Sequence, residues 1–424
     1  MLEVAPFTPA VLEHALRKRH GCGGSRTHIS VVHVKVHGFV FPAGLAIPDV
    51  EILIDKALRR AGRTKFSDLS FVQPLSLLLK SYAEEADLSS FGRYACRWDL
   101  ERCLANLLRL DMAEEEDPGI VTRQIRKPVF ITGMPRSASS FLHTMLSLDP
   151  DNIVPRCWQL IYPYPLHRCF LDLRKTRVAM ELCLFHCMTP GLEGLHHLSA
   201  DAPQECTDIT AQIFQSIRFE NTHRIPSYQA WIDRHGHHDA LLFHRRFLQH
   251  LDAQAPGRRW VLKSPDHVFA LNAIRTVYPD AQIVFLHRDP VSVVFSCAKL
   301  AERLRRPFTN HLDPMEIGRH VSARLAEAAA HMIDAASHVP HILHLNYQDV
   351  VASPMEAVRK VYRHCGFGLS ETAAQRMAAF VEQPHQRSPR QHDLAEFGLD
   401  AGSLRDRFAS YVRHFAVPQK MSIQ

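Results

Sequence analysis

The segment from Pro128 to Pro150, PVFITGMPRSASSFLHTMLSLDP, constrains the fold more than any other stretch of the chain. It begins as a β-branched apolar run, passes through a glycine, a proline, an arginine and several serines, and continues with the apolar spacing of a helix. That order predicts a strand, a phosphate-sized loop and a helix, with backbone N–H groups aimed at one anion. The ATP-binding pattern GxxxxGK[ST] does not fit, because no Gly-Lys pair occurs where the pattern requires it.

Length and composition are those of an ordinary globular chain. The 424 residues are 46% hydrophobic and 22% charged, enough for one large domain or two modest ones. The formal net charge of +6 is mild and no long run of like charges occurs, so we expect a small anionic ligand rather than a nucleic acid. The 10 cysteines show no disulfide-framework spacing, which predicts a reducing, cytoplasmic setting. No apolar stretch reaches about 18 residues, so no transmembrane span is expected.

Three regions of the chain differ in pattern. Residues 1–45 predict a poorly specified N-terminal tail, and residues 46–125 predict a helical lead-in packed on the core. Residues 126–424 alternate short apolar runs with helical patterns, and only residues 151–258 interrupt the alternation, as a helical insertion. The alternation predicts an α/β fold, a P-loop-like three-layer sandwich with a central parallel sheet and ligands at the carboxyl ends of its strands. The predicted strands are 129–132, 259–263, 282–287 and 341–346.

The first loop, GMPRSASS, offers one cation and three hydroxyl groups to an anion. These belong to Arg136, Ser137, Ser139 and Ser140. Because a turn from strand to helix also gathers backbone N–H groups and the positive end of the helix dipole, we expect a phosphorylated ligand there. A plain turn rich in small residues is the alternative interpretation of this loop taken by itself.

Two further strand ends carry cations. WVLKSPDH ends its apolar run at Lys263 and then starts a helix, with His267 in the opening turn. FLHRDPVSVVFSC repeats the geometry with Arg288, and Asp289 is the expected N-cap. Ser296 follows Arg288 by about two helical turns, which places the two about 80° apart around a helix, so both can face one ligand. Each residue alone fits a solvated or capping role, but together they predict a site for two anionic groups.

These motifs, followed by LNYQDVVASPMEAVRKVY, closely resemble the sulfotransferases that use 3′-phosphoadenylyl sulfate (PAPS), in particular the bacterial-type branch with a PRS loop, LKSPxH and HRDP. The likeness covers roughly residues 50–415. It implies transfer of a sulfuryl group from PAPS to a hydroxyl of a small molecule, lipid or sugar, with the 151–258 insertion on the acceptor side. The alternatives are a non-catalytic nucleotide-binding relative and then a phosphoryl-transferring kinase, against which the missing GK[ST] counts.

The resemblance also implies contacts to the nucleotide. The loop around Arg136 would wrap the 5′-phosphosulfate. Arg288 and Ser296 would hold the 3′-phosphate, with Arg390 in SPRQH as its last ligand. Tyr347 would lie near the adenine. The expected nucleotide-binding residues are Arg136, Ser137, Ala138, Ser139, Ser140, Arg288, Ser296, Tyr347 and Arg390.

Catalysis requires fixed cations at the leaving oxygen and a proton acceptor for the attacking hydroxyl. Arg136 and Lys263 can supply the charge, so no metal is expected. For the proton acceptor, His267 follows the Lys-Ser-Pro corner, and Glu205 in DAPQEC matches an acidic pair of the branch. Gln159 stands where relatives often carry a glutamate, and an amide cannot accept the proton. If that glutamate is the base of the branch, this chain has lost it.

Ala138 is a second departure from the family, whose loop commonly has glycine at this position. Glycine tolerates a positive φ and a close approach of the backbone to a ligand. Ala138 therefore either distorts the loop or occupies a position that needs only a negative φ. Together with the amide at Gln159, this departure favours nucleotide binding over full turnover.

Overall fold

The computed structural model describes residues 46–165, 171–192, 194–195, 198–383 and 393–419, so the predicted tail lies outside the described residues. The lead-in is helical, as the apolar spacing predicts. Helix α2 ends where Gly62 takes the left-handed conformation at φ 64°, which a glycine adopts without steric cost. The elements before the sheet are α2 (Val50–Ala61), α3 (Val72–Glu84), α4 (Ser90–Glu116) and the 3₁₀ helix η1 (Ile120–Thr122).

All four predicted runs are strands of one parallel sheet: β1 (Val129–Gly133), β3 (Arg259–Lys263), β4 (Gln282–His287) and β5 (Ile342–Asn346). The order β2-β3-β1-β4-β5 places β1 at the centre. The edge strand β2 (Asn152–Ile153) was not predicted, because two residues show no periodicity. Its pairing with β3 is supported by Arg259, whose Nε donates to Asn152 Oδ1 at 3.0 Å.

Helices follow each strand, and the 151–258 insertion is helical apart from β2 within its described residues. Among the described residues, no helix is both long and apolar enough to cross a membrane. After β1 and β2 come α5 (Ser139–Leu146), α6 (Cys157–Ile161), α7 (Arg174–Met188), α8 (Thr207–Thr210), η2 (Ala211–Ile213), α9 (Arg218–Thr222), α10 (Pro226–His235) and α11 (His238–Gln254). After β3 and β4 come η3 (Pro265–Phe269), α12 (Leu271–Val277), α13 (Pro290–Arg305) and α14 (Pro314–His338). After β5 come α15 (Tyr347–Ala352), α16 (Pro354–Cys365), α17 (Glu371–Val381), η4 (Ala395–Phe397), α18 (Ala401–Arg407) and α19 (Ala409–His414).

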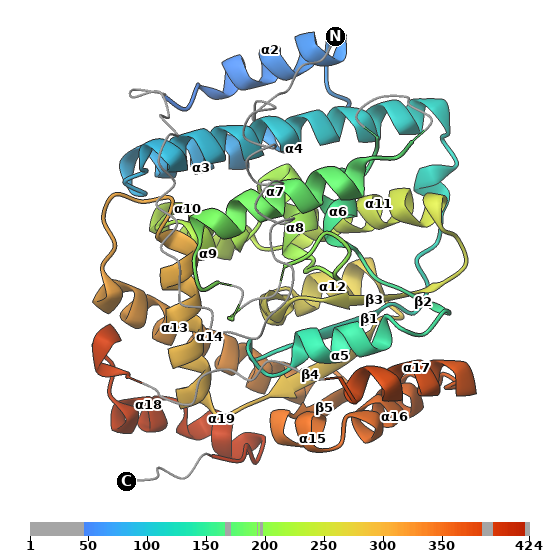
Figure 1. The fold of residues 1–424 in the computed structure, drawn as a ribbon, viewed down its shortest axis with the longest axis vertical. Coiled ribbons are helices and arrows are strands. Elements are labelled where there is room, and N and C mark those ends of the chain that lie inside the picture. The colour runs from blue at the N-terminus through green and yellow to red at the C-terminus, as the bar shows by residue number, and fades with distance from the viewer. Residues whose placement is uncertain (1–45, 166–170, 193, 196–197, 384–392, 420–424) are drawn as a thin grey trace, which may run out of the picture.

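The sheet is covered on both faces, which confirms the three-layer prediction (Figure 1). Successive side chains of a strand point to opposite faces, so Phe130 and Ile131 belong to different cores. Ile131 packs in the core with α5, α16 and α17. Phe130 packs in the core with α11, α12 and the lead-in helices, in a cluster that extends from Leu53 to Tyr278. Burial on both faces explains why the strands are almost continuously apolar.

Candidate active site

The turn from β1 to α5 lies at the centre of the site. Gly133 has φ 115°, and a Cβ on it would lie 2.4 Å from the Leu286 carbonyl oxygen, so only glycine lets the turn pass this close to β4. Arg136 and Ala138 also adopt positive φ, at 59° and 68°. The loop then enters α5 at Ser139, which turns the first N–H groups of that helix toward the carboxyl edge of the sheet.

Ala138 thus keeps the conformation expected of glycine and carries the strain of it, since a left-handed residue with a Cβ costs about 1–2 kcal/mol. We expect Ala138→Gly to raise the free energy of unfolding by about 0.5–1 kcal/mol, measured by urea denaturation. As a matched control, Ala374→Gly in the regular helix α17 should lower it by about 1 kcal/mol. Equal decreases in the free energy of unfolding of both variants would show that Ala138 is unstrained.

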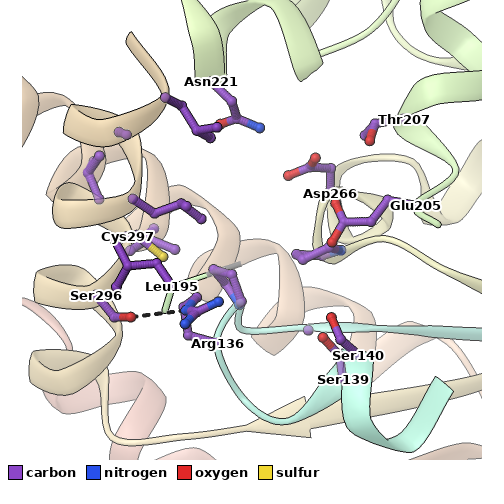
Figure 2. Close-up of a pocket in the computed structure, with 18 of the residues that line it drawn as sticks. Arg136, Ser139, Ser140, Leu195, Glu205, Thr207, Asn221, Asp266, Ser296 and Cys297 are labelled. Carbon is purple, nitrogen blue, oxygen red and sulfur yellow. Dashed lines mark hydrogen bonds between the residues drawn. The ribbon is translucent and has the colours of Figure 1, made fainter. Parts of the chain in front are cut away.

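A cavity of about 1300 Å³ opens at this edge of the sheet (Figure 2). It is bounded by the β1–α5 loop, residues 204–208, η3, α13, α14 and the start of α15. Since a pocket for one small ligand measures about 300–1000 Å³, this cavity has room for two ligands. The predicted site residues that line it are Arg136, Ala138, Ser139, Ser140, Glu205, Arg288, Ser296 and Tyr347.

Among the described residues, three predicted site residues are not in the lining of the cavity: Ser137, Lys263 and His267. The Ser137 hydroxyl is buried and donates to the Met134 carbonyl oxygen, so it holds the loop together. His267 is 5% exposed and packs edge-on against Phe130, with ring centroids 5.1 Å apart. Burial lowers the pKa of His267 well below its ordinary value, and its Nε2 has no hydrogen-bond partner in the described structure. Arg390 lies outside the described residues.

Two arginines form the polar end of the cavity. Arg136 Nε donates to Ser296 Oγ at 3.0 Å, and Arg288 donates to the Arg136 carbonyl oxygen. The Arg288 guanidinium also lies 4.1 Å from the centroid of the Tyr347 ring. Burial, assisted by the nearby Arg136 charge, lowers the pKa of Arg288. Neither arginine forms an ion pair with a carboxylate in the described structure, so this end of the cavity favours an anion.

Lys263 lies at the end of β3 beside the first loop, as predicted. It is only 2% exposed, and its Nζ is 3.1 Å from Ser140 Oγ. The same ammonium forms an ion pair with Glu205. The backbone fixes this arrangement, because Ile131 pairs with Lys263 in the sheet and Cys206 N–H donates to the Lys263 carbonyl oxygen at 3.0 Å. A cation is therefore held between Ser140, at the start of α5, and Glu205, which both line the cavity.

Gln159 lies in α6 and is not among the residues that line the cavity. Its Oε1 accepts a hydrogen bond from the Arg156 N–H at 3.1 Å, so the side chain caps the helix. A glutamate can make the same cap. We therefore expect Gln159→Glu to leave kcat of the transferase reaction within about two-fold of the wild type, because its carboxylate does not reach the cavity. A rise of ten-fold or more would revive the hypothesis of a lost base.

The sequence context of Asp266, in KSPDH, indicates only the start of a helix. In the structure it lines the cavity, and Figure 2 shows its carboxylate beside Glu205 and directed toward the open space. Burial, with repulsion from Glu205, raises the pKa of Asp266 to about 7. The available signal was its place three residues beyond a strand-end lysine, where cavities of α/β folds form. Asn221 and Arg324 are two more cavity residues that the sequence did not reveal.

Comparison with known proteins agrees with this geometry. Stf3 of Mycobacterium bovis, an omega-hydroxy-beta-dihydromenaquinone-9 sulfotransferase, is 23% identical over 310 residues, or 69% of this chain and 78% of Stf3. The crystal structure of sulfotransferase STF1 from Mycobacterium tuberculosis H37Rv is similar with a TM-score of 0.76 and 28% identity, covering 86% of this chain and 99% of STF1. STF9 from Mycobacterium avium gives 0.79 and 23%, covering 88% and 97%. The Sulfotransferase family model matches residues 128–371, more than half of the chain. The chain therefore belongs to the sulfotransferase family and is a PAPS-dependent enzyme of that family, as its motifs predicted.

Proposed function

We propose that this enzyme transfers a sulfuryl group from PAPS to the hydroxyl of a large, mainly apolar acceptor. The observation that carries the proposal is the cavity itself. Two arginines without carboxylate partners in the described structure line it, and many apolar side chains line other parts of its wall. Lys263 contacts Ser140 and Glu205, which both line the cavity.

At the nucleotide end, Arg136, the loop N–H groups and the hydroxyls of Ser139 and Ser140 would hold the 5′-phosphosulfate. Arg288 and Ser296 would hold the 3′-phosphate. The hydrogen bond from Arg136 Nε to Ser296 Oγ, at 3.0 Å, supports this arrangement, because it joins one residue of each proposed subsite. The Tyr347 ring, already stacked on Arg288, would border the adenine.

In the transfer, the acceptor oxygen forms a bond to sulfur while the bond from sulfur to the 5′-phosphate oxygen breaks. The electron pair of that bond stays on the leaving phosphate oxygen, so negative charge grows there in the transition state. Lys263 Nζ, near Ser140 at the phosphate loop, is placed to stabilise this charge, and Arg136 adds a second cation. These two cations support a reaction in which no metal is needed.

The acceptor end of the cavity favours an apolar molecule. Apolar side chains from several separate elements line the cavity, with charged side chains such as Glu220 and Arg324 among them. The apolar surface suits a hydrocarbon body that presents one hydroxyl. The name of Stf3 describes a hydroxylated menaquinone as its substrate, which also supports a lipid-like acceptor here. The apolar lining residues include Phe185, Leu195, Leu198, Ile217, Val268, Phe269, Phe295, Leu300, Leu304 and Leu325.

The test is transfer of ³⁵S-labelled sulfate from PAPS to a graded series of alcohols: ethanol, glucose, 1-dodecanol and farnesol. We expect kcat/KM to rise with apolar length and to be highest for the long alcohols. Labelling of glucose alone would refute the apolar acceptor. Tight binding of the product adenosine 3′,5′-bisphosphate (PAP) without any labelled alcohol would instead favour a non-catalytic nucleotide-binding protein.

A further inference from the structure

Asp266 occupies a distinctive place at the centre of the cavity. It lies in the first turn of η3, where its N–H donates to the Ser264 hydroxyl at 3.3 Å. The backbone is thus held by the cap, but the carboxylate makes no hydrogen bond or ion pair within the part of the chain that the structure describes. In Figure 2 it points into the cavity from the same wall as Glu205, opposite Ser296. An unpaired carboxylate in such a place serves no evident structural purpose.

The other candidate proton acceptors are engaged or out of reach. Glu205 is held in an ion pair by Lys263. His267 lies behind the cavity wall against Phe130. Gln159 is an amide that caps α6. Two more carboxylates line the cavity, and Asp208 pairs with Arg218 while Glu220 contacts His320. Among the described carboxylates of the cavity wall, Asp266 is therefore the one without an ion pair.

We propose that Asp266 is the catalytic base that accepts the proton of the acceptor hydroxyl, an assignment that rests on the proposed function. As the acceptor oxygen bonds to sulfur, its proton passes to an Asp266 carboxylate oxygen. The bond from sulfur to the 5′-phosphate breaks, and its electron pair leaves with PAP. Asp266 then releases the proton to solvent when the products depart. The sulfate ester keeps the acceptor oxygen, so atoms and charge balance.

The charged groups around Asp266 suit this task. Burial has the largest effect on its pKa and raises it, and the carboxylates of Glu205 and of Glu220 from α9 raise it further. Arg324 of α14 and Lys263 of β3 act in the opposite direction. The resulting pKa of about 7 lies near the pH at which a general base combines a useful ionised fraction with good proton affinity.

The test compares two acceptors that differ in acidity. The assay is run about one pH unit above neutral. There a long aliphatic alcohol, 1-dodecanol, must lose its proton during transfer, whereas 4-nitrophenol, whose own pKa is close to neutral, is mostly ionised before it binds. We expect Asp266→Asn to lower kcat for 1-dodecanol by about 10²-fold or more, within the usual range for general-base catalysis, and to change kcat for 4-nitrophenol by less than about three-fold. Asp266→Glu should recover part of the rate with the alcohol. Asp313→Asn is the matched control, because Asp313 is the N-cap of α14 and is not among the residues that line the cavity. It should leave both rates unchanged.

The pH profile gives a second readout. The base must be ionised to act, so the wild-type rate with 1-dodecanol should rise with pH through about 7, and this limb should vanish in Asp266→Asn. If Asp266→Asn lowers kcat equally for both acceptors, the assignment is overturned in favour of a positioning role. If the variant keeps the wild-type kcat for both acceptors, the assignment is overturned outright. If the wild type binds PAP but sulfates neither acceptor, the proposed function fails, and the base assignment fails with it.

Discussion

Lys263→Met is expected to lower kcat for sulfuryl transfer by about 10²–10³-fold, the usual effect of removing one donor from a developing oxyanion. Affinity for PAP should change by less than about five-fold, because the ammonium acts on charge that grows only in the transition state. The structural basis is the position of Nζ, 3.1 Å from Ser140 Oγ at the edge of the phosphate loop. Steady-state kinetics with labelled PAPS and calorimetry with PAP separate the two effects.

The control for Lys263→Met must account for Glu205. Breaking an ion pair in which both groups are buried destabilises proteins by about 3–5 kcal/mol. The Glu205 side chain is 26% exposed, so the loss of its ion pair with Lys263 should cost less than that. Adding Glu205→Gln should therefore restore much of the free energy of unfolding without restoring kcat. If the double variant recovers turnover as well as stability, Lys263 would have only a structural role.

Much of this site follows from the order of elements. The β-branched apolar runs identify β1, β3, β4 and β5, and parallel pairing then brings the strand ends with Lys263 and Arg288 to the same edge as the first loop. The contact of Lys263 with Ser140 is a consequence of that register. Strand periodicity and the parallel order thus predict which residues meet, because they depend on backbone geometry alone.

The sequence does not predict the directions in which the loop side chains point. Nothing in GMPRSASS distinguishes the Ser137 hydroxyl, which donates to the Met134 carbonyl, from the hydroxyls of Ser139 and Ser140 in the cavity wall. Ala138 keeps a left-handed φ although its side chain disfavours it, because the geometry of the turn outweighs the local preference. Asp266 has the sequence context of an ordinary acid in a first helical turn, and only the packing around it shows a cavity residue.

Arg288→Ala is expected to weaken binding of PAP by about 10²-fold, since loss of two charge-assisted hydrogen bonds costs about 3 kcal/mol. The same variant should bind AMP, which lacks the 3′-phosphate, within about two-fold of the wild type. The prediction rests on an arginine that has no carboxylate partner in the described structure and whose pKa is lowered by burial, so an anion would relieve its desolvation. Calorimetry with PAP, AMP and ATP measures all three affinities under one ionic strength.

A matched control for Arg288→Ala is Arg359→Ala, since Arg359 lies exposed on α16, where it pairs with Glu356 at 3.6 Å. It should leave all three affinities unchanged, which excludes a general effect of lost positive charge. Arg288 also donates to the Arg136 carbonyl oxygen, so its removal can disturb the loop that binds the 5′-phosphate. If the variant disturbs that loop, its affinities for PAP and AMP would fall equally. A selective loss for PAP instead assigns Arg288 to the 3′-phosphate, because that group is the difference between the two nucleotides.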